Sequence, residues 1–538
     1  MGRTSHVALS GHGSNKAADD SNSSFSPVSL GESSIICIKP RGVLYDILSL
    51  KEETSSDDSV SFRLSHQSAT DVPKSLLDKF LVEEAPEHLR AADNRKVHLV
   101  VSTSSGMGLA LDFYNSVLQP LLGGFGLSAA VPGDDGDGKS SSLNLVTTRD
   151  AQSIREFAAS LPLGVEHTVV LMSGDGGIME SLNGKATVDD DDEDGPAMVR
   201  LRPLPLIAML PLGTGNALFN SLHKGVYAAC EAESAAPSPL ALGLRTLLRG
   251  RRAPLPSFRV DFSPGSWQIS YRGAVATVPG AAVEEQLSPV THLYGAIVAS
   301  YGFHAQLVWE SDTPAYRKHG AKRFGMVAAE LLKESHAYHA RVERKLLLPP
   351  SSEAGQQPQP IGRQDRHAYV LATLVSNLER TFTISPASRP LDGALRLVHF
   401  GPVGGERTME IMTQAYNDGQ HVGMNWKRAT TAAADENGGE DKGKEEEEEE
   451  EEEEGVAYEQ VGEVRVVTHE ADARWRKVCV DGTIVELPLE GSMTVRTESA
   501  PHLEILVDPS VSTAATTGFL NQVQGRRPVA GISSTFLA

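Results

Sequence analysis

HTVVLMSGDGGIMESLNG, residues 167–184, decides the fold predicted for this chain. Its apolar, β-branched run at 168–172 predicts a strand buried on both faces, as in a parallel sheet. The strand breaks at SGDGG (173–177), where three glycines let the backbone turn sharply and let a ligand approach its amides. From Ile178 apolar residues recur at helical spacing, and Gly184 is expected to end the helix as a C′ glycine. The stretch therefore predicts a strand, a glycine-rich turn and a helix.

The same order of elements is predicted twice more within about 120 residues. A strand at 97–101 precedes the loop STSSGMG (102–108) and a helix expected at 110–122, and a strand at 206–210 precedes PLGTGN (211–216) and another helix. Because the carboxyl ends of parallel strands meet at one edge of a sheet, the three loops are expected to line one crevice. Free N–H groups and the positive ends of helices favour phosphate in such a crevice.

These motifs together carry a family resemblance. SSGMG (104–108), SGDGG followed by Glu180 and Asn183-Gly184, and PLGTGNALF (211–219) resemble the catalytic domain of diacylglycerol and sphingosine kinases. That family shares its nucleotide-binding architecture with NAD kinases and phosphofructokinases, and the resemblance extends with gaps over roughly residues 92–510. Ser173 is closer to the sphingosine kinase branch, because diacylglycerol kinases usually carry glycine there.

Length and charge set the class of protein. The chain has 538 residues, of which 40% are hydrophobic, so it can hold more than one domain with a sizeable core. Much of the net charge of −21 lies in two acidic runs, 189–194 and 445–454, which are expected to stay solvated. The rest of the chain is only mildly acidic. Nucleic-acid binding is therefore not expected.

Cysteine content and hydropathy indicate the compartment. Cys37, Cys230 and Cys479 have no paired spacing, which favours a reducing, cytoplasmic setting without disulfides. No run of 18 apolar residues occurs, so no membrane-spanning helix is expected. Contact with a membrane is therefore expected to be peripheral, through apolar residues near Phe303, Leu307, Trp309 and Phe324. The oligomeric state is not predicted.

The predicted fold class is α/β + β. A doubly wound α/β nucleotide-binding domain at 92–228 is followed by a β-sandwich lipid-binding domain at 255–510, the latter from short β-rich runs that end with Leu503–Val507. A helix is expected at Arg323–Tyr338, within the second domain. Residues 33–91 are expected to form a small β-rich accessory segment with a hairpin-like pair, 131–142 a surface loop, and 234–255 a linker. Disorder or mobility is expected at 1–32, 349–364, 430–454 and 511–538.

The resemblance implies an ATP site with Mg²⁺, whose protein ligands stay unassigned. The amides of the glycine loops would cradle phosphates, and arginines would neutralise phosphoryl charge. The residues expected to bind nucleotide are Ser105, Gly106, Gly108, Thr148, Ser173, Gly174, Gly176, Gly213, Thr214, Gly215, Asn216, Arg317, Arg323, Asp481 and Gly482. For Thr148 the alternative is a helix N-cap, and for the two arginines it is a basic helix start on the surface.

Acceptor and catalytic residues follow from the same resemblance. The segments 301–311 and 316–324 are similar to the sphingosine kinase signature around its lipid pocket, and Phe303, Gln306 and Glu310 are expected to bind the acceptor. Asp175 is expected to accept the proton of the lipid hydroxyl as the bond to phosphorus forms. Glu180 is expected to support Asp175 or the metal, and its alternative is an exposed helix residue.

Several positions depart from the family pattern. Ser102-Thr103 stand where the family usually has Asn-Pro, Gly177 where diacylglycerol kinases carry threonine, and Thr483 where the late motif carries glutamate. Gln306 falls where sphingosine kinases carry an aspartate that pairs with the cationic amine of the sphingoid base. The leading hypothesis is a kinase of sphingoid long-chain bases. The alternatives are a diacylglycerol or ceramide kinase, a non-catalytic nucleotide- or lipid-binding scaffold, and an NAD or sugar kinase of the same architecture.

Overall fold

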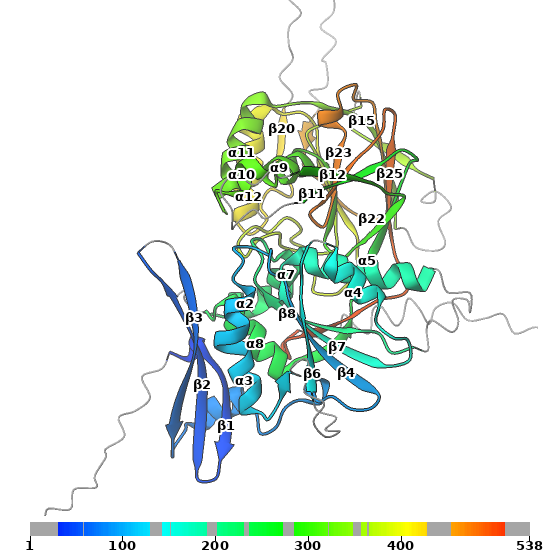
Figure 1. Cartoon of the computed structure of the whole chain (residues 1–538). Coiled ribbons are helices and arrows are strands. Elements are labelled where there is room, and N and C mark those ends of the chain that lie inside the picture. The colour runs from blue at the N-terminus through cyan, green and yellow to red at the C-terminus, as the bar shows by residue number, and fades with distance from the viewer. Residues whose placement is uncertain are drawn as a thin grey trace, which may run out of the picture.

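A computed structural model describes residues 31–56, 59–129, 142–150, 152–190, 202–230, 236–272, 284–320, 322–347, 357–362, 365–427 and 453–511. Figure 1 shows an α/β part in cyan and green below a β-rich part, with a blue N-terminal sheet to one side. Most of the predicted disordered ranges lie outside the described residues, as do the loop at 131–141 and most of both acidic runs. Within the described ranges, no helix combines the length and apolarity needed to cross a bilayer.

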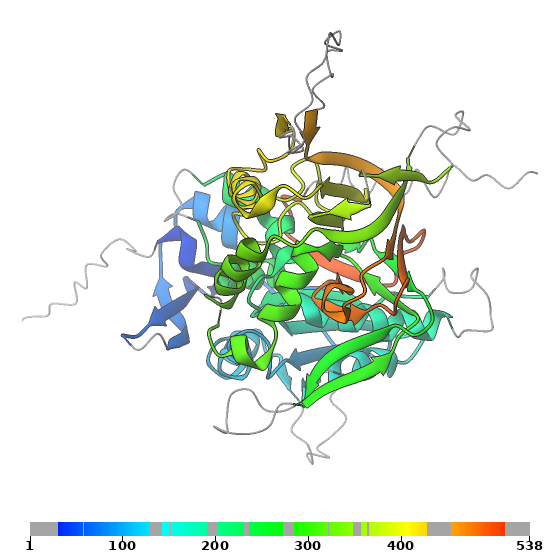
Figure 2. The ribbon, with the colours of Figure 1, turned by 90° about the horizontal axis from the view of Figure 1, so that it is seen from above.

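The accessory segment is a three-stranded antiparallel sheet, as the hairpin prediction required. Its elements are β1 (Ile35–Arg41), β2 (Leu44–Thr54), β3 (Val60–Ala69) and α1 (Lys74–Phe80). One face packs Phe62 edge-on against Phe113, with ring centroids 5.3 Å apart. The guanidinium of Arg245 donates to the carbonyl of Ile35 at 2.7 Å. The sheet is thus attached to the α/β part, although it stands outside the body of the molecule in the view from above (Figure 2).

A seven-stranded sheet forms the core of the α/β part, in the order β5-β6-β4-β7-β8-β26-β9. Its strands are β4 (Arg95–Val101), β5 (Ser128–Ala129), β6 (Ser142–Thr147), β7 (Glu166–Ser173), β8 (Leu206–Pro211), β9 (Arg251–Pro254) and β26 (Glu504–Val507). All neighbours are parallel except β26 and β9. This is the parallel arrangement that the buried apolar runs predict.

Helices cover both faces of this sheet, as in doubly wound folds. One face packs against α2 (Ala110–Phe113), a π-helical turn (Tyr114–Leu118), α3 (Gln119–Gly124) and α8 (Pro239–Arg249). The other packs against α4 (Ser153–Ala159), α5 (Asp175–Asp190) and α7 (Ala217–Ala228). Figure 1 shows α5 and α7 between the two large sheets of the molecule, and both helices contact the second part, while α4 packs against α5.

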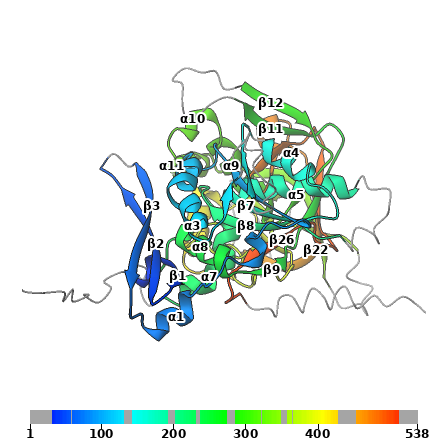
Figure 3. The same cartoon turned by 60° about the horizontal axis from the view of Figure 1, so that its bottom comes forward.

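The strand β26 corrects the predicted domain boundary. The apolar pattern predicts that Leu503–Val507 belongs to the second domain, but β26 pairs in parallel with β8 and antiparallel with β9 (Figure 3). The chain therefore returns to the first sheet near its end. A linker at 234–255 is also wrong, because Pro239–Arg249 forms the buried helix α8 and 251–254 forms β9. A local apolar pattern reveals a strand but not the sheet that it joins.

The second part is built on a 14-stranded sheet. Its main path is β12-β11-β24-β23-β14-β18-β19-β22-β25-β10-β13, with β15, β16 and β17 beside it. The bounds are β10 (Phe258–Phe262), β11 (Trp267–Arg272), β12 (Glu284–Pro289), β13 (His292–Gly295), β14 (Val298–Gly302), β15 (Tyr338–Leu346), β16 (Gln359–Ile361), β17 (Arg366–His367), β18 (Tyr369–Thr373), β19 (Arg396–Phe400), β22 (Ala457–Thr468), β23 (Lys477–Val480), β24 (Thr483–Glu486) and β25 (Ser492–Thr497). The strands form one continuous hydrogen-bonded path, whereas a β-sandwich consists of two separate sheets. The predicted β-sandwich is therefore not confirmed.

Four helices and a small hairpin complete this part. They are α9 (Phe303–Ser311), α10 (Pro314–Arg317), α11 (Lys322–Glu334), α12 (Gly404–Tyr416), β20 (Asn425–Lys427) and β21 (Glu453–Gly455). The helix expected at Arg323–Tyr338 ends at Glu334, and Tyr338 begins a strand. Two segments expected to be disordered contain ordered ends, because β16 pairs with β15 and β21 pairs with β20.

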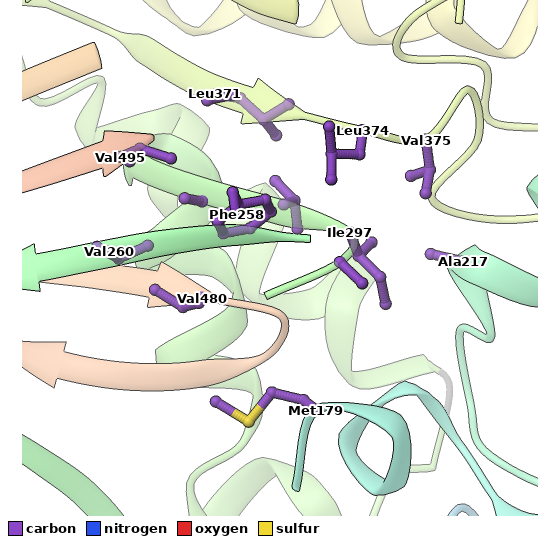
Figure 4. Close-up of a cluster of buried hydrophobic side chains, with 14 of the residues drawn as sticks. Met179, Ala217, Phe258, Val260, Ile297, Leu371, Leu374, Val375, Val480 and Val495 are labelled. Atoms are coloured by element: carbon purple, nitrogen blue, oxygen red, sulfur yellow. The ribbon is translucent and has the colours of Figure 1, made fainter. Parts of the chain in front are cut away.

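The hydrophobic core is continuous across the two parts. Figure 4 shows Met179 of α5 and Ala217 of α7 beside Ile297, Phe258 and Val480 of the second part. All five side chains are buried in one cluster. The helices that begin at the glycine loops are therefore packed against the second part as well as against their own sheet.

Candidate active site

Three loops meet at the carboxyl ends of β4, β7 and β8, as predicted, and glycines make the meeting possible. A Cβ on Gly106 would lie 2.3 Å from the carbonyl oxygen of Leu212, and one on Gly213 would lie 2.4 Å from the Cα of Gly174. Gly106 also has a φ of +55°, which side chains disfavour. The loops 102–108, 173–177 and 211–216 are thus in backbone-to-backbone contact.

Hydroxyl groups link these loops, and two of them belong to Ser102 and Thr103, which stand where the family usually has Asn-Pro. The Oγ atom of Ser105 lies 2.7 Å from that of Ser102 and 2.8 Å from that of Ser173. Thr148, at the end of β6, accepts the amide of Thr103 at 3.1 Å. Thr148 therefore holds the first loop and does not cap α4, so the alternative N-cap role is wrong. Whether it also meets a phosphate stays a prediction.

The side chain of Ser173 restricts the size of the residue at position 177. A Cβ on Gly177 would lie 2.5 Å from the Oγ of Ser173 and 2.7 Å from its Cβ. A side chain at position 177 is therefore excluded as long as serine precedes the Gly-Asp-Gly turn. Gly177, which departs from the diacylglycerol kinase pattern, therefore fits beside Ser173 without displacing its side chain.

Asp175 is the first residue of α5 and lies at the start of α7. Its carboxylate accepts the amides of Ala217 at 2.6 Å and Leu218 at 3.2 Å. Burial raises the pKa of Asp175 to about 6, although these two amides act in the opposite direction. The side chain is thus oriented by the first turn of a neighbouring helix and is mostly ionised at neutral pH.

Asn216 shapes the third loop. It has a left-handed backbone with φ of +52°, and its Oδ1 accepts the amide of Gly213 at 3.1 Å. Its Nδ2 donates to the carbonyl of Gly213 at 2.9 Å. The neighbouring Thr214 is exposed, and the space above Gly215 holds only the carbonyl of Leu378, 3.7 Å from an added Cβ. The side chain of Asn216 is therefore engaged within its own loop.

Asp481 and Gly482 form the two-residue turn between β23 and β24, with φ of +46° and +88°. The buried Asp481 carboxylate accepts the amides of Ala296 (2.7 Å), Ile297 (3.1 Å) and Val298 (2.7 Å). Burial raises the pKa of Asp481 to about 7 against the effect of these amides, and the charge of Asp175 adds to the rise. Two carboxylates thus interact across the two parts of the molecule.

Glu180 forms an ion pair with α4. Its Oε2 accepts Nε of Arg155 on α4 at 2.7 Å, and its side chain is largely buried. Glu180 therefore links α4 to α5. Neither of its predicted roles, support of Asp175 or the metal and an exposed helix position, includes this link. Gly184 belongs to the same contact: it lies inside α5, and a Cβ there would be 2.3 Å from the carbonyl oxygen of Arg155. The prediction that Gly184 ends the helix is wrong.

The predicted arginines share one partner in the second part. Nε of Arg317 lies 2.9 Å from Oδ1 of Asp312, and Arg323 lies 3.5 Å from the same atom. Across the described ranges, no hydrogen bond or ion pair links either arginine to the three glycine loops. Their phosphate-binding role stays a prediction.

The predicted acceptor residues lie on α9. Gln306 is buried and donates from Nε2 to Oε1 of Glu310 at 2.7 Å. The same carboxylate binds the guanidinium of Arg474 at 3.0 Å, and that guanidinium also contacts Glu334 at 3.1 Å. Phe303 is buried at the start of the helix. The carboxylate of Glu310 is therefore already paired with a cation, a partner that the sequence does not reveal.

The loops have the donors that a triphosphate requires. In the part of the chain that the structure describes, the amides of Gly106, Gly174 and Gly215 have no hydrogen-bond partner, whereas those of Gly108 and Gly213 are bonded within their loops. A Cβ on Gly176 would meet no atom within 4 Å. Among the same residues, no three His, Cys, Asp or Glu side chains gather as a metal site. Phosphate therefore fits the loops, and a cation would need phosphate oxygens among its ligands.

Comparison with known proteins agrees with this geometry. The diacylglycerol kinase catalytic domain matches residues 137–240, which include the second and third loops but not the first. This match supports a lipid kinase. No curated protein matches the chain.

Solved structures of diacylglycerol kinases are among those to which the chain is similar. A putative diacylglycerol kinase from Bacillus anthracis str. Sterne has 15% identity and a TM-score of 0.44, over 78% of this chain and all of the other. A diacylglycerol kinase from the same organism has 13% identity and a TM-score of 0.39, with the same coverage. Both TM-scores are below 0.5, so this likeness adds no support to the assignment of individual residues.

Proposed function

We propose that the protein transfers the γ-phosphoryl group of ATP to a hydroxyl group of a lipid. The observation that carries this proposal is the place of Asp175, whose carboxylate lies where three glycine loops and the first turns of α5 and α7 meet. Phosphoryl transfer depends on positioning and on neutralising charge, and this edge of the sheet offers free amides for that purpose. The match to the diacylglycerol kinase catalytic domain supports the same reaction.

In this mechanism the loops hold the phosphates and Asp175 receives a proton. The amides of Gly106, Gly174 and Gly215 would bind phosphate oxygens, and Asp175 would orient the acceptor hydroxyl and take its proton late in the transfer. Mg²⁺ would be held by phosphate oxygens, and it would supply charge neutralisation when bound. The amides of Ala217 and Leu218 at the start of α7 orient the Asp175 carboxylate for this role.

Two classes of acceptor are candidates. The Ser173 motif favours a sphingoid long-chain base. The contacts of α9 favour a neutral lipid such as diacylglycerol or ceramide, because Gln306 is uncharged and the carboxylate of Glu310 is paired with Arg474. A cationic amine at this place would have to compete with a guanidinium for Glu310.

Contact with the membrane is proposed to be peripheral. Of the four residues near which this contact is expected, Phe303 is buried and Leu307, Trp309 and Phe324 are half-buried, while Met326, close to Phe324 in sequence, is 41% exposed. The expected location of the contact stays a prediction. Trp267 and Leu287 are 42% and 50% exposed on the neighbouring strands β11 and β12. Exposed tryptophan is typical of the membrane–water interface, so these two residues are further candidates for transient contact with a lipid surface.

One assay tests the proposed reaction and its acceptor. The full-length protein is incubated with γ-labelled ATP, Mg²⁺ and separate vesicles that contain a sphingoid base, ceramide or diacylglycerol. Label is expected in one lipid class. Gln306→Asp should then raise the ratio of sphingoid to neutral product roughly tenfold, the order of a charge-assisted hydrogen bond. Gln414→Asp on the surface of α12 is the matched control. ATP binding without transfer to any lipid would favour the scaffold alternative.

A further inference from the structure

Two side chains of the α/β part each bind one residue of the second part through both its main-chain amide and its main-chain carbonyl. Asn183 of α5 accepts the amide of Tyr294 at 2.9 Å and donates to its carbonyl at 2.8 Å. Ser221 of α7 accepts the amide of Asn377 at 2.9 Å and donates to its carbonyl at 2.9 Å. Asn183 and Ser221 are each only 4% exposed. We refer to these two pairs as the α5 clamp and the α7 clamp.

The clamps hold the two helices whose first turns meet at Asp175. Asn183 lies eight residues after Asp175 on α5, about 12 Å along the helix axis. Ser221 lies four residues after Ala217, about one turn into α7. A shift of either helix would therefore change the distance between the Asp175 carboxylate and the amides of Ala217 and Leu218.

The α5 clamp also reaches the second carboxylate. Tyr294 is two residues before Ala296, whose amide is the first of three that bind Asp481. A second contact of α5 with the second part joins Oγ1 of Thr483 at the start of β24, two residues after Asp481, to the sulfur of Met179 at 3.4 Å. The position of α5 against β13 and β24 therefore sets how close Asp175 is to Asp481.

We propose that Asn183 and Ser221 are positioning residues for Asp175, which fix α5 and α7 to the second part so that the Asp175 carboxylate stays bound to the amides of Ala217 and Leu218. This inference rests on the proposed role of Asp175 as proton acceptor. It assigns part of the active-site geometry to the second part of the molecule, although Asp175 and the glycine loops belong to the first.

The test removes each clamp alone and both together. Asn183→Ala and Ser221→Ala should each lower kcat about tenfold with the KM for ATP changed less than twofold, because the phosphate loops stay intact. The double variant should be no slower than the slower single variant, since releasing either helix frees the same carboxylate. Ser221→Thr keeps the hydroxyl, and a cavity of about 20 Å³ beside Ser221 can take part of the methyl group. It should retain most of kcat.

A matched control variant distinguishes a loss of Asp175 positioning from a general loss of protein stability. Tyr458→Phe removes a hydroxyl that binds Ser385 Oγ at 2.7 Å and the amide of Ala387 at 3.0 Å, all within the second part. It should lower the melting temperature by a similar amount without changing kcat or its pH profile. Clamp variants that lose stability but keep the wild-type kcat would overturn the proposal. So would single effects that multiply in the double variant.

A measurement that needs no lipid substrate distinguishes failure of the clamp proposal from failure of the proposed kinase reaction. The melting temperature is measured from pH 5 to pH 8 with and without Asp175→Asn, in the wild type and in each clamp variant. The difference between the two curves reports the ionisation of Asp175, with Asp481 as the facing charged group. The pH at which this difference changes should shift by at least half a unit when a clamp is removed. If it moves although no lipid is phosphorylated, the clamps position Asp175 and only the proposed reaction fails. If it does not move, the clamp proposal fails.

Discussion

The carboxylate of Asp175 accepts a hydrogen bond of 2.6 Å from the amide of Ala217, the first residue of α7. Asn216, the residue in the ordinary capping position, uses its side chain to bind Gly213 instead. Asp175 therefore satisfies amides at the start of a helix that it does not belong to. The expected proton acceptor is also a structural link between two loops.

Asp175→Asn should separate these two roles. Asparagine caps helices about as well as aspartate, so the protein should fold and bind ATP with little change. The amide cannot accept the hydroxyl proton, so turnover should fall roughly 10²-fold or more, the usual weight of a positioned acid–base group. Steady-state kinetics and ATP titration measure the two effects.

Asp150→Asn is the control for this variant. Asp150 accepts the amides of Gln152 at 3.1 Å and Ser153 at 3.0 Å before α4, so it has the same capping role away from the loops. Its substitution should leave turnover unchanged. Equal turnover of Asp175→Asn and the wild type would show that Asp175 is not the proton acceptor.

Stability should depend on pH through Asp175 and Asp481. Burial raises their pKa values to about 6 and about 7, above the value near 3.9 of an unfolded aspartate. Between about pH 4 and 7 the native state thus holds more protons at these sites, and their stabilising contribution is lost as the pH rises through that window.

Asp481→Asn isolates this contribution. Buried histidines such as His98, whose pKa burial lowers to about 4, act with the opposite sign, so the wild type and the variant are compared at each pH. The free energy of unfolding of the wild type should fall relative to that of the variant between pH 5 and 7. The relative slope is at most ~1.4 kcal/mol per pH unit, the effect of one proton. A constant difference between the two curves would contradict the raised pKa of Asp481.

The two glycines of the third loop should respond differently to alanine. Gly213→Ala places a Cβ 2.4 Å from Gly174, so it should separate two loops and reduce both stability and ATP affinity. Gly215→Ala has no close neighbour, so it should keep stability while ATP binds about tenfold more weakly, because its methyl group takes phosphate space. Gly225→Ala, in the open interior of α7, should only stabilise the helix, by about 1 kcal/mol. Unchanged ATP affinity in Gly215→Ala would exclude the third loop from the nucleotide site.

Ser173 and Gly177 should show strong coupling. Gly177→Ala should destabilise the protein by about 1–3 kcal/mol, the usual cost of overpacking a buried site, because its Cβ meets the Ser173 side chain. Ser173→Gly removes that side chain, so the double variant should regain most of the loss. A chemical-denaturation cycle of the four proteins measures the coupling energy. Additive effects would show that the steric contact does not decide position 177.

Local patterns predicted the elements around the site well. The runs at 97–101, 168–172 and 206–210 each form a parallel strand, and each is followed by its loop and helix, because buried strands and glycine turns leave a local signature. Contacts between residues far apart in the sequence leave no such local signature. The sequence could not show that Asp481 binds the amides of Ala296–Val298, or that Arg474 pairs with Glu310.

Glycines were harder to interpret, because the same residue serves different purposes. Gly184 has the sequence context of a helix end, but its missing side chain allows α4 to approach α5. Asp481-Gly482 matches the family's late motif in part, and its backbone is an ordinary hairpin turn. Only the position of neighbouring elements distinguishes these uses.

The strand β26 has a consequence for how the protein is made. Among the described strands, β9 pairs with β26 alone, and β26 is synthesised roughly 250 residues after β9. At ~5–20 residues per second, the ribosome takes roughly 10–50 s to cover that distance. The α/β sheet therefore cannot be completed while the chain grows, and a chain that stops before residue 504 leaves β8 with an open edge. Such unpaired edges promote aggregation, so interrupted synthesis should yield insoluble fragments instead of a small nucleotide-binding protein.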